Sequence, residues 1–180
     1  MSMDEIFPIA GLIPLAEEEA IAMNEQEFRL LYDATARPIR AYLVGMTGRR
    51  DVADDLLQET YCRFLVRQPQ SMNVDETRQY LFRIASNLLR DRWRRGEDES
   101  WQEIPEHGFS VDVDAQIDMR AAMGALKPRE RELLWLAYVE GMDHAEIAAA
   151  TGLRAISVRM LLFRARRRAA GFLLSKRETV

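Results

Sequence analysis

Hydrophobic residues recur at helical spacing through most of the chain, and no stretch alternates with the period of two that strands need. The first periodic stretch covers 25–45. Its apolar face consists of Phe28, Leu31, Tyr32, Ile39, Leu43 and Val44. Pro38 lies inside this stretch, and an interior proline removes a hydrogen bond and clashes with the preceding turn. We therefore predict a helix over 25–45 that ends or kinks near Arg37.

Two further helices are predicted before residue 96. Asp51 is a suitable N-cap for the second helix. The apolar positions of this helix are Val52, Leu56, Leu57, Phe64 and Leu65. A loop around Pro69 covers 68–75, and a long helix covers 77–95. The apolar stripe of that helix consists of Tyr80, Leu81, Ile84, Leu88 and Leu89. Three such helices form one compact bundle of about 70 residues, which is an ordinary domain size.

The second half of the chain is also predicted to be helical. Its helical segments cover 115–126, 128–139, 143–150 and 155–174. The stretch 96–113 holds Gly, Pro, Ser and acidic residues, so it is predicted to be a linker. The first 24 residues mix prolines with apolar side chains and are predicted to be an extension. The expected fold is all-α, with two small helical domains over 25–95 and 114–180 joined by an acidic linker.

Composition excludes several classes of protein. With 48% hydrophobic residues the chain is not a disordered one. No apolar run approaches the roughly 20 residues that cross a bilayer, so we expect no membrane insertion and a cytoplasmic location. The single cysteine, Cys62, cannot form an internal disulfide or a zinc site by itself. We interpret Cys62 as an apolar filler inside the fold, and we expect no metal and no cofactor.

Charge is strongly segregated along the chain. The first 27 residues carry seven acidic side chains and no basic one, and 96–118 carries eight acidic and no basic ones. In contrast, 77–95 carries six arginines and one aspartate, and 152–180 carries eight basic residues and one glutamate. Two basic blocks in a chain of net charge −4 indicate two separate anionic contacts, of which nucleic acid is the simplest. The alternative is that each basic helix is merely a solvated face.

Residues 143–174 have the outline of a helix-turn-helix. Asp143 and Glu146 form a capping-box pattern before a short helix, Gly152 permits the turn, and a long basic helix follows. In such a motif the second helix lies in the DNA major groove with its first residues at base edges. Here those residues are Arg154, Ser157 and Arg159. The residues expected to meet phosphates are Arg164, Arg166, Arg167 and Arg168. A helical hairpin with a basic surface is the alternative.

The other basic block interleaves arginines with aromatic residues over 80–95. Phe82 and Trp93 fall outside the predicted buried stripe. Exposed rings beside guanidinium groups suit the unstacked bases of a single strand, with the arginines following the phosphates. The alternative is that both rings belong to the core or seat the linker.

A third segment carries an acidic face. At helical spacing Asp51, Asp54, Asp55, Gln58 and Glu59 share one side of the second helix. No His or Cys ligand lies nearby, and the segment has neither a recognisable nucleophile nor a phosphate loop, so we reject catalysis and metal binding. A carboxylate-rich helix face is more simply a docking surface for a basic partner.

Together these segments resemble the bacterial sigma factors of the extracytoplasmic-function group. The stretch DDLLQETY at 54–61 is similar to the family's polymerase-binding helix, and 80–95 is similar to its promoter-melting and minus-ten helix. The stretches LKPRERE at 126–132, YVEG at 138–141 and AEIA at 145–148 resemble the family's second domain. The resemblance covers about Phe28 to Arg168, most of the chain.

The resemblance implies a transcription initiation factor that is not an enzyme. Its partners would be promoter DNA and core RNA polymerase, through the clamp helices of the largest subunit and the flap, with an anti-sigma protein as a possible inhibitor. The polymerase-binding residues would be Asp51, Asp54, Asp55, Leu56, Gln58 and Glu59. The minus-ten residues would be Asn73, Arg78, Phe82, Arg83, Asn87, Arg90, Arg92, Trp93 and Arg94. The minus-thirty-five residues would be Arg154, Ser157, Arg159, Arg164, Arg166 and Arg167. The acidic linker would thread the RNA exit region.

Three features depart from the family's pattern. Arg154 stands where a small hydroxyl residue usually caps the recognition helix, and Met160, Leu161 and Phe163 stand where polar or basic residues are usual. The apolar extension is also outside the pattern, and we hypothesise that it contacts one of the domains. The alternative function is a stand-alone helix-turn-helix regulator, which would have no use for the acidic face over 51–59. A protein with no DNA role is a third reading, and it predicts binding that ignores salt.

Overall fold

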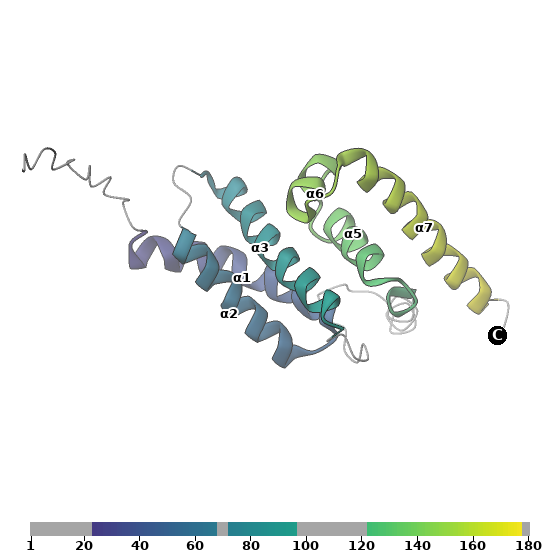
Figure 1. Cartoon of the computed structure of the whole chain (residues 1–180), viewed down its shortest axis with the longest axis horizontal. Helices are drawn as coiled ribbons and strands as arrows, with labels where there is room; N and C mark the ends of the chain where they lie inside the picture. The colour runs from purple at the N-terminus through teal and green to yellow at the C-terminus, as the bar shows by residue number, and fades with distance from the viewer. Residues whose placement is uncertain (1–22, 68–71, 97–121, 178–180) are drawn as a thin grey trace, which may run out of the picture.

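The computed structural model describes residues 23–67, 72–96 and 122–177. The helices within these ranges are α1 (Glu25–Thr47), α2 (Arg50–Arg67), α3 (Val74–Arg94), α5 (Pro128–Tyr138), α6 (His144–Thr151) and α7 (Ala155–Arg177). Figure 1 shows α1, α2 and α3 packed together at one end of the molecule and α5, α6 and α7 at the other. No strand occurs in the described ranges, so the predicted all-α fold is confirmed. The predicted segments 1–24 and 96–113 lie almost wholly outside those ranges, as does most of 115–126.

Side-chain caps explain where several helices begin. The Asn24 side chain accepts a hydrogen bond from the backbone N–H of Glu27 at 2.9 Å, and the Glu27 carboxylate accepts one from the Asn24 N–H at 3.0 Å. Asn73 and Glu76 form the same reciprocal pair before α3. This cap starts α3 at Val74, three residues before the predicted start at Thr77.

Helix α1 does not end at Pro38, which corrects the predicted break near Arg37. The helix continues for more than two turns to Thr47 and closes on Gly48, whose φ of 66° is left-handed. Ala34, whose carbonyl would have bonded to residue 38, lies on the exposed side, where water can replace the lost donor. Beyond the proline, Ile39, Tyr42 and Leu43 are fully buried, so packing stabilises this half of the helix.

Each three-helix unit has an apolar centre of its own. In the first unit the centre combines Tyr42 and Leu43 of α1 with Leu81, Phe82 and Leu89 of α3, all nearly or wholly inaccessible. In the second unit the centre combines Leu133 and Leu136 of α5, Ile147 of α6, and Val158 and Leu162 of α7. Cys62 is exposed on α2, which corrects its interpretation as an interior filler.

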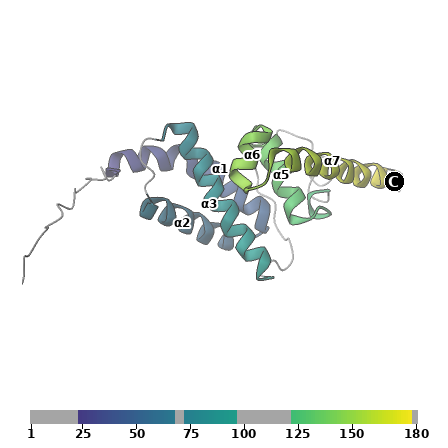
Figure 2. The ribbon, with the colours of Figure 1, turned by 45° about the horizontal axis from the view of Figure 1, so that its top comes forward.

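The two units pack directly against each other. Helix α6 lies along α3, and α5 contacts α1, as the views in Figures 1 and 2 agree. At the second contact the ring of Trp135 lies on Gly45, where a Cβ would come within 2.6 Å of the ring. Only a glycine permits this approach, and the buried residues of both units consequently form one continuous apolar cluster.

Candidate functional sites

The acidic face of α2 is fully formed and points to solvent. Asp54, Asp55, Gln58 and Glu59 are exposed, and Leu56 is half-buried. Asp51 is exposed in the first turn of α2, one residue after the helix begins at Arg50, which corrects its prediction as the N-cap. Neither Asp55 nor Gln58 has a hydrogen-bond partner or an ion pair within the described part of the chain. These two side chains are therefore available to a partner without breaking any internal contact.

Arginines orient the other carboxylates of this face. Arg40 of α1 donates two hydrogen bonds to Asp54, at 2.5 and 3.0 Å, and this bonding holds the pKa of Asp54 below its usual value. Arg49 likewise bonds Asp51 at 2.5 and 3.2 Å and lowers the pKa of that carboxyl. Glu59 accepts from Arg63 at 2.6 Å. Asp51 and Asp54 consequently keep their negative charge to a lower pH than an unpaired aspartate does.

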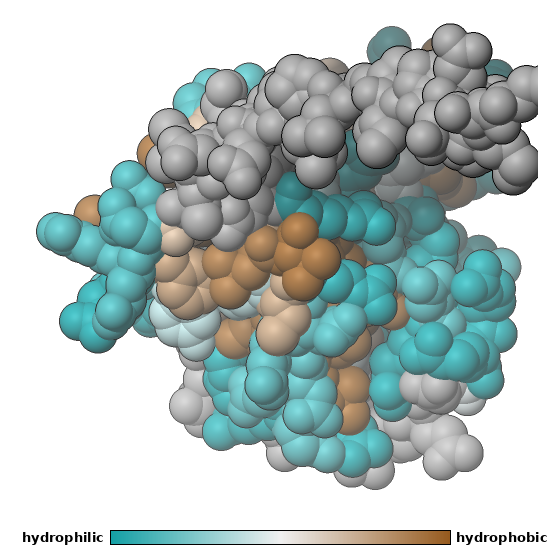
Figure 3. All heavy atoms as spheres, turned by 60° about the vertical axis from the view of Figure 1, so that its left-hand side comes forward, coloured by the Kyte–Doolittle hydropathy of each residue, from teal (hydrophilic) through white to brown (hydrophobic). Residues whose placement is uncertain are grey.

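An open apolar groove of about 520 Å³ borders the acidic face between α1 and α2. Its lining residues are Phe28, Tyr32, Arg40, Asp54, Leu57, Gln58, Tyr61, Cys62 and Leu65. Figure 3 looks toward this end of the first unit and shows hydrophobic side chains gathered among hydrophilic ones. A hydrophobic centre with a charged rim is the usual anatomy of a protein–protein interface. The groove therefore adds an apolar component to the predicted docking surface.

The predicted minus-ten residues on α3 divide into two groups. Arg83 and Arg94 are exposed, with Arg94 paired to Asp91 at 3.1 Å, and Asn87, Arg92 and Trp93 are half-buried. Asn73 caps α3, as described above. Phe82 is only 1% exposed and packs at 5.3 Å, centroid to centroid, against Tyr42. This corrects the prediction that the Phe82 ring lies outside the buried stripe, because the second unit and α1 together leave that side of α3 no access to solvent.

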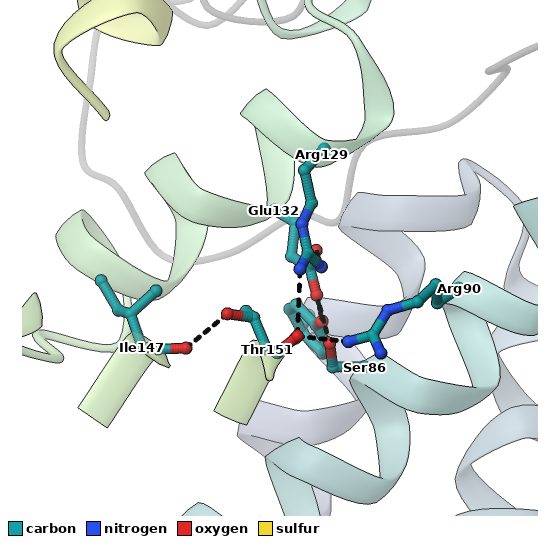
Figure 4. Close-up of polar contacts among 7 residues, drawn as sticks. Ser86, Arg90, Arg129, Glu132, Ile147 and Thr151 are labelled. Carbon is teal, nitrogen blue, oxygen red and sulfur yellow. Dashed lines mark hydrogen bonds and ion pairs between the residues drawn. The ribbon is translucent and has the colours of Figure 1, made fainter. Parts of the chain in front are cut away.

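Arg78 and Arg90 face the second unit. Arg78 donates to the Glu140 carboxylate at 2.8 Å, and its guanidinium lies 5.3 Å from the centre of the Phe82 ring. Arg90 donates to the backbone carbonyl of Thr151, which also accepts from Arg129 at 3.0 Å (Figure 4). The arrangement thus uses two predicted DNA-contacting arginines to join the two units.

A buried carboxylate lies at the centre of the same interface. Glu132 of α5 is wholly inaccessible, and its Oε1 accepts hydrogen bonds from the Tyr42 hydroxyl at 2.9 Å and from Ser86 at 2.5 Å. Its Oε2 pairs with Arg129 at 2.6 Å (Figure 4). Burial, first, and the neighbouring carboxylate raise the pKa of Tyr42 well above its usual value. A buried charge is tolerated only with such partners, so Glu132 specifies how the units meet.

The helix-turn-helix predicted over 143–174 is present in α6 and α7. Asp143 accepts from the N–H groups of Ala145 and Glu146, and Gly152 at φ 70° makes the turn. Ile147 and Val158 are fully buried between the two helices. The backbone carbonyl of Arg154 accepts from Ser157 and Val158 at 2.9 and 3.0 Å, so Arg154 begins α7 through its backbone. Its side chain is left exposed.

The solvent side of α7 combines basic and apolar residues. Arg154 and Arg159 are exposed, Ser157 is half-buried, and Arg164, Arg166 and Arg167 are exposed further along. Arg166 also donates to the Tyr138 hydroxyl at 3.1 Å, and Arg168 pairs with Glu130 at 2.6 Å. Of the three unusual apolar residues, Met160 and Phe163 are about half exposed, whereas Leu161 is half-buried.

Sequence reasoning missed the residues that join the two units. Gln79 and Gly45 were not named, and Glu132 and Glu140 appeared only inside stretches that resemble the family, although each of the four makes a contact between units. The only signal was Glu132 and Arg131 at positions that would otherwise belong to the apolar face of α5. A charge on a buried face requires a partner, but the sequence does not say from which element.

Comparison with protein families finds two models that match in order along the chain. The model "Sigma-70 region 2" matches residues 31–99, and "Sigma-70, region 4" matches residues 116–168. Among curated relatives, the ECF RNA polymerase sigma factor SigE of Mycolicibacterium smegmatis is 29% identical over 140 residues, covering 71% of this chain and 54% of the relative. EcfG of Rhodopseudomonas palustris is 27% identical over 149 residues, covering 78% of this chain and 81% of the relative.

Solved structures agree at the level of the fold. The sigma factor RpoE of Bartonella quintana, in complex with the anti-sigma factor NepR, gives a TM-score of 0.65 at 24% identity, covering 82% of this chain and 97% of that one. CnrH in complex with the cytosolic domain of CnrY gives 0.65 at 23% identity, covering 87% and 94%. The chain belongs to the sigma-70 family, as an extracytoplasmic-function sigma factor, and it spans about half the length of several curated relatives that it matches.

The described residues also bear on two other classes of site. None of the helices there is long and apolar enough to cross a membrane. Within the same ranges, no three His, Cys, Asp or Glu side chains gather as they would around a metal ion.

Proposed function

We propose that the protein is a transcription initiation factor that binds core RNA polymerase and directs it to specific promoters. The observation that carries the proposal is the pairing, in one chain, of the acidic α2 face with the helix-turn-helix of α6 and α7. Helix α2 lies within the region 2 match, and α6 and the first part of α7, up to residue 168, lie within the region 4 match. A stand-alone helix-turn-helix regulator needs the second element only, so this alternative is not favoured.

In this proposal the acidic face of α2 contacts the clamp helices of the polymerase's largest subunit. Asp55 and Gln58 are exposed and have no hydrogen-bond or ion-pair partner among the described residues, and the Arg40–Asp54 and Arg63–Glu59 pairs lie beside them. Leu56 and the groove next to it would supply apolar contact area. Electrostatic complementarity of this kind governs the association rate and the choice of partner.

DNA contacts are assigned to the two basic helices. Helix α3, with the loop before it, would recognise and melt the minus-ten element, and α7 would read the minus-thirty-five element from the major groove through Arg154, Ser157 and Arg159. The exposed arginines after Ser157 would fix α7 on the phosphates, and the second domain would touch the polymerase flap. The protein itself would catalyse nothing, since the polymerase supplies the chemistry, and it would act in the cytoplasm.

The domain boundaries proposed are 25–95 for the polymerase and minus-ten domain and 114–180 for the minus-thirty-five domain. An acidic linker over 96–113 would join them and thread the RNA exit region. An anti-sigma protein is the partner class we propose for regulation, because the named relatives RpoE and CnrH were solved with NepR and CnrY.

The test is assembly with core polymerase. Asp55→Lys combined with Glu59→Lys reverses two exposed charges of the face while leaving the buried side of α2 unchanged. We expect the variant to lose co-purification with core enzyme and promoter-directed transcription on a promoter library.

The matched control is Asp33→Lys combined with Glu25→Lys, which makes the same charge change on exposed positions of α1. This control should assemble like the unchanged protein. If both double variants assemble normally, the acidic face is not the polymerase site. If the unchanged chain itself fails to assemble while folded, the proposed function is wrong.

A further inference from the structure

Three exposed apolar side chains form a row along α7, which we call the α7 stripe. Ile156, Met160 and Phe163 are 73%, 48% and 55% exposed. Their spacing of four and then three residues places them on one side of the helix. Single exposed apolar residues are ordinary on a protein surface, but three in one row indicate a contact with something outside the fold.

The α7 stripe lies opposite the side of α7 that packs in the core. Val158, Leu162 and Ala165 are buried where α7 packs on α5 and α6 (Figure 1). At about 100° per residue, the stripe lies within about 50° of the direction opposite these buried residues. In a helix-turn-helix the second helix enters the major groove, and its first residues contact base edges. Ile156 and Met160 lie in the first two turns of α7, on the side that faces away from the core.

Arginines lie on both sides of the α7 stripe. At the same angle per residue, Arg159 lies on one side of it and Arg164 on the other, and both are exposed. The guanidinium of Arg167 lies 5.9 Å from the centre of the Phe163 ring, so the stripe ends at a cation stacked on its last ring. A major groove offers base edges between two walls of phosphates, which matches an apolar row between positive charges. This complementarity favours duplex DNA over a protein as the occupant.

We propose that Ile156 and Met160 recognise thymines in the major groove through the C5-methyl group of the base. Cytosine presents an amino group there, which an apolar side chain would leave without a hydrogen-bond partner. The two residues are about 6 Å apart along the helix axis, which corresponds to about two base-pair steps of roughly 3.4 Å. The recognised element therefore contains two thymines about two base pairs apart. This inference rests on the proposed function only in taking α7 as the helix that enters the groove.

Selection of duplexes tests this sequence preference. The full chain is mixed with a pool of fluorescein-labelled DNA duplexes that carry a randomised window, and the bound duplexes are sequenced. We expect two enriched thymine positions about two base pairs apart. Each thymine is then replaced by deoxyuridine, which lacks only the methyl group. Affinity, measured by fluorescence anisotropy, should fall about fourfold for each methyl group removed, the value for one buried carbon of this kind.

Single variants assign each thymine to a residue. Met160→Ala and Ile156→Ala should each bind the thymine and deoxyuridine duplexes nearly equally at one position and keep the preference at the other. The matched control is Gly171→Ala, which also raises the helix propensity of α7, while its new Cβ meets nothing within 4 Å. It should keep both preferences. Arg164→Ala should weaken binding to all duplexes alike and reduce the salt slope by about one, as the loss of a phosphate contact does.

The inference is wrong if the selection enriches no thymine, if deoxyuridine duplexes bind as tightly as thymine duplexes, or if the two stripe variants keep both preferences. It is also wrong if light scattering shows a dimer that either stripe variant dissociates, since the α7 stripe would then bind a second copy of the chain. Assembly of the unchanged chain with core polymerase is measured in parallel. Failure of that assembly counts against the proposed function, whereas a chain that assembles but ignores the methyl group counts against thymine recognition by α7.

Discussion

The burial of Tyr61 makes the stability of the fold depend on pH. Its ring packs against Phe28 and Tyr32, with ring centres 5.9 and 4.9 Å apart, and its hydroxyl shares a 2.7 Å hydrogen bond with Thr35. Burial raises the pKa of Tyr61 to about 12, although the bond to Thr35 opposes the shift. The folded chain therefore keeps this proton at a pH where an unfolded chain releases it.

This difference predicts a loss of stability in alkali. An unfolded tyrosine ionises from about pH 10, so between pH 10 and 12 the folded state binds more protons, and the free energy of unfolding falls as pH rises. We expect Tyr61→Phe to lose less stability over that interval than the unchanged protein, as measured by urea unfolding at a series of pH values. Tyr138→Phe, at an exposed position, is the control. Parallel falls in all three proteins would refute the assignment to Tyr61.

Glu132 illustrates a different property of single residues. The side chain has three partners, of which Tyr42 and Ser86 come from the other unit. Removing one partner of a buried charge is costly, whereas the fully paired group is tolerated. Glu132 consequently determines which way the two units pack together more than it determines how stable that packing is.

Helix α3 carries both a structural cap and a candidate DNA contact at the same residue. Asn73 was predicted to touch the minus-ten element, and in the structure its side chain accepts from the Glu76 N–H at 2.9 Å. The two roles are separable because aspartate caps a helix as well as asparagine does, whereas alanine does not.

We therefore predict that Asn73→Ala lowers the free energy of unfolding by about 1 kcal/mol and that Asn73→Asp leaves it nearly unchanged. Both values are measured by chemical denaturation. Transcription from a cognate promoter then reports the second role. If Asn73→Asp is stable and inactive, the amide also contacts DNA, and if it is stable and active, the residue is a cap only. Equal stability of the alanine and aspartate variants would contradict the capping role.

Helix α1 shows why a local rule can fail within an element. Pro38 predicted a break, yet Ile39, Tyr42 and Leu43 after it are wholly buried, and Tyr42 contacts Phe82 of α3 and Glu132 of the second unit. The burial of such side chains contributes about 1.5–3 kcal/mol each, which outweighs one lost hydrogen bond of about 1 kcal/mol. The helix therefore continues through the proline.

The packing of the two units against each other predicts how the whole molecule unfolds. Because one apolar cluster runs through both units, we expect a single calorimetric transition for the unchanged protein. Gly45→Ala should separate it into two, with the smaller second unit unfolding at lower temperature, since it loses the contact of Trp135 with α1.

Gly171→Ala serves as the control in that experiment and should retain one transition. One transition in Gly45→Ala, at an unchanged temperature, would show that the Trp135 contact contributes little to joining the units. Scanning calorimetry at several heating rates provides the measurement and checks reversibility.

The sequence carried enough information to locate the described helices apart from the false break at Pro38 and the late start of α3, and to specify the helix-turn-helix and the acidic face of α2. These features depend on local periodicity, caps and turn glycines, as at Asp143 and Gly152, and local rules act over a few residues. The sequence was insufficient to predict that Phe82 is buried and that Cys62 is exposed. Burial on a helix depends on which neighbour covers each side, and the pattern of one helix does not contain that information.

The contacts between the two units became known only from the tertiary structure. Arg78 meets Glu140 across 62 positions of sequence, and Tyr42 meets Glu132 across 90. The sequence does not distinguish an exposed arginine of α3 from one that is bonded to the second unit. A charge pattern shows which groups a side chain can bind, but it does not show which of them lies next to it in the folded chain. Packing of α5 and α6 on α1 and α3 selects the partner, and with it which arginines of α3 are bonded within the molecule.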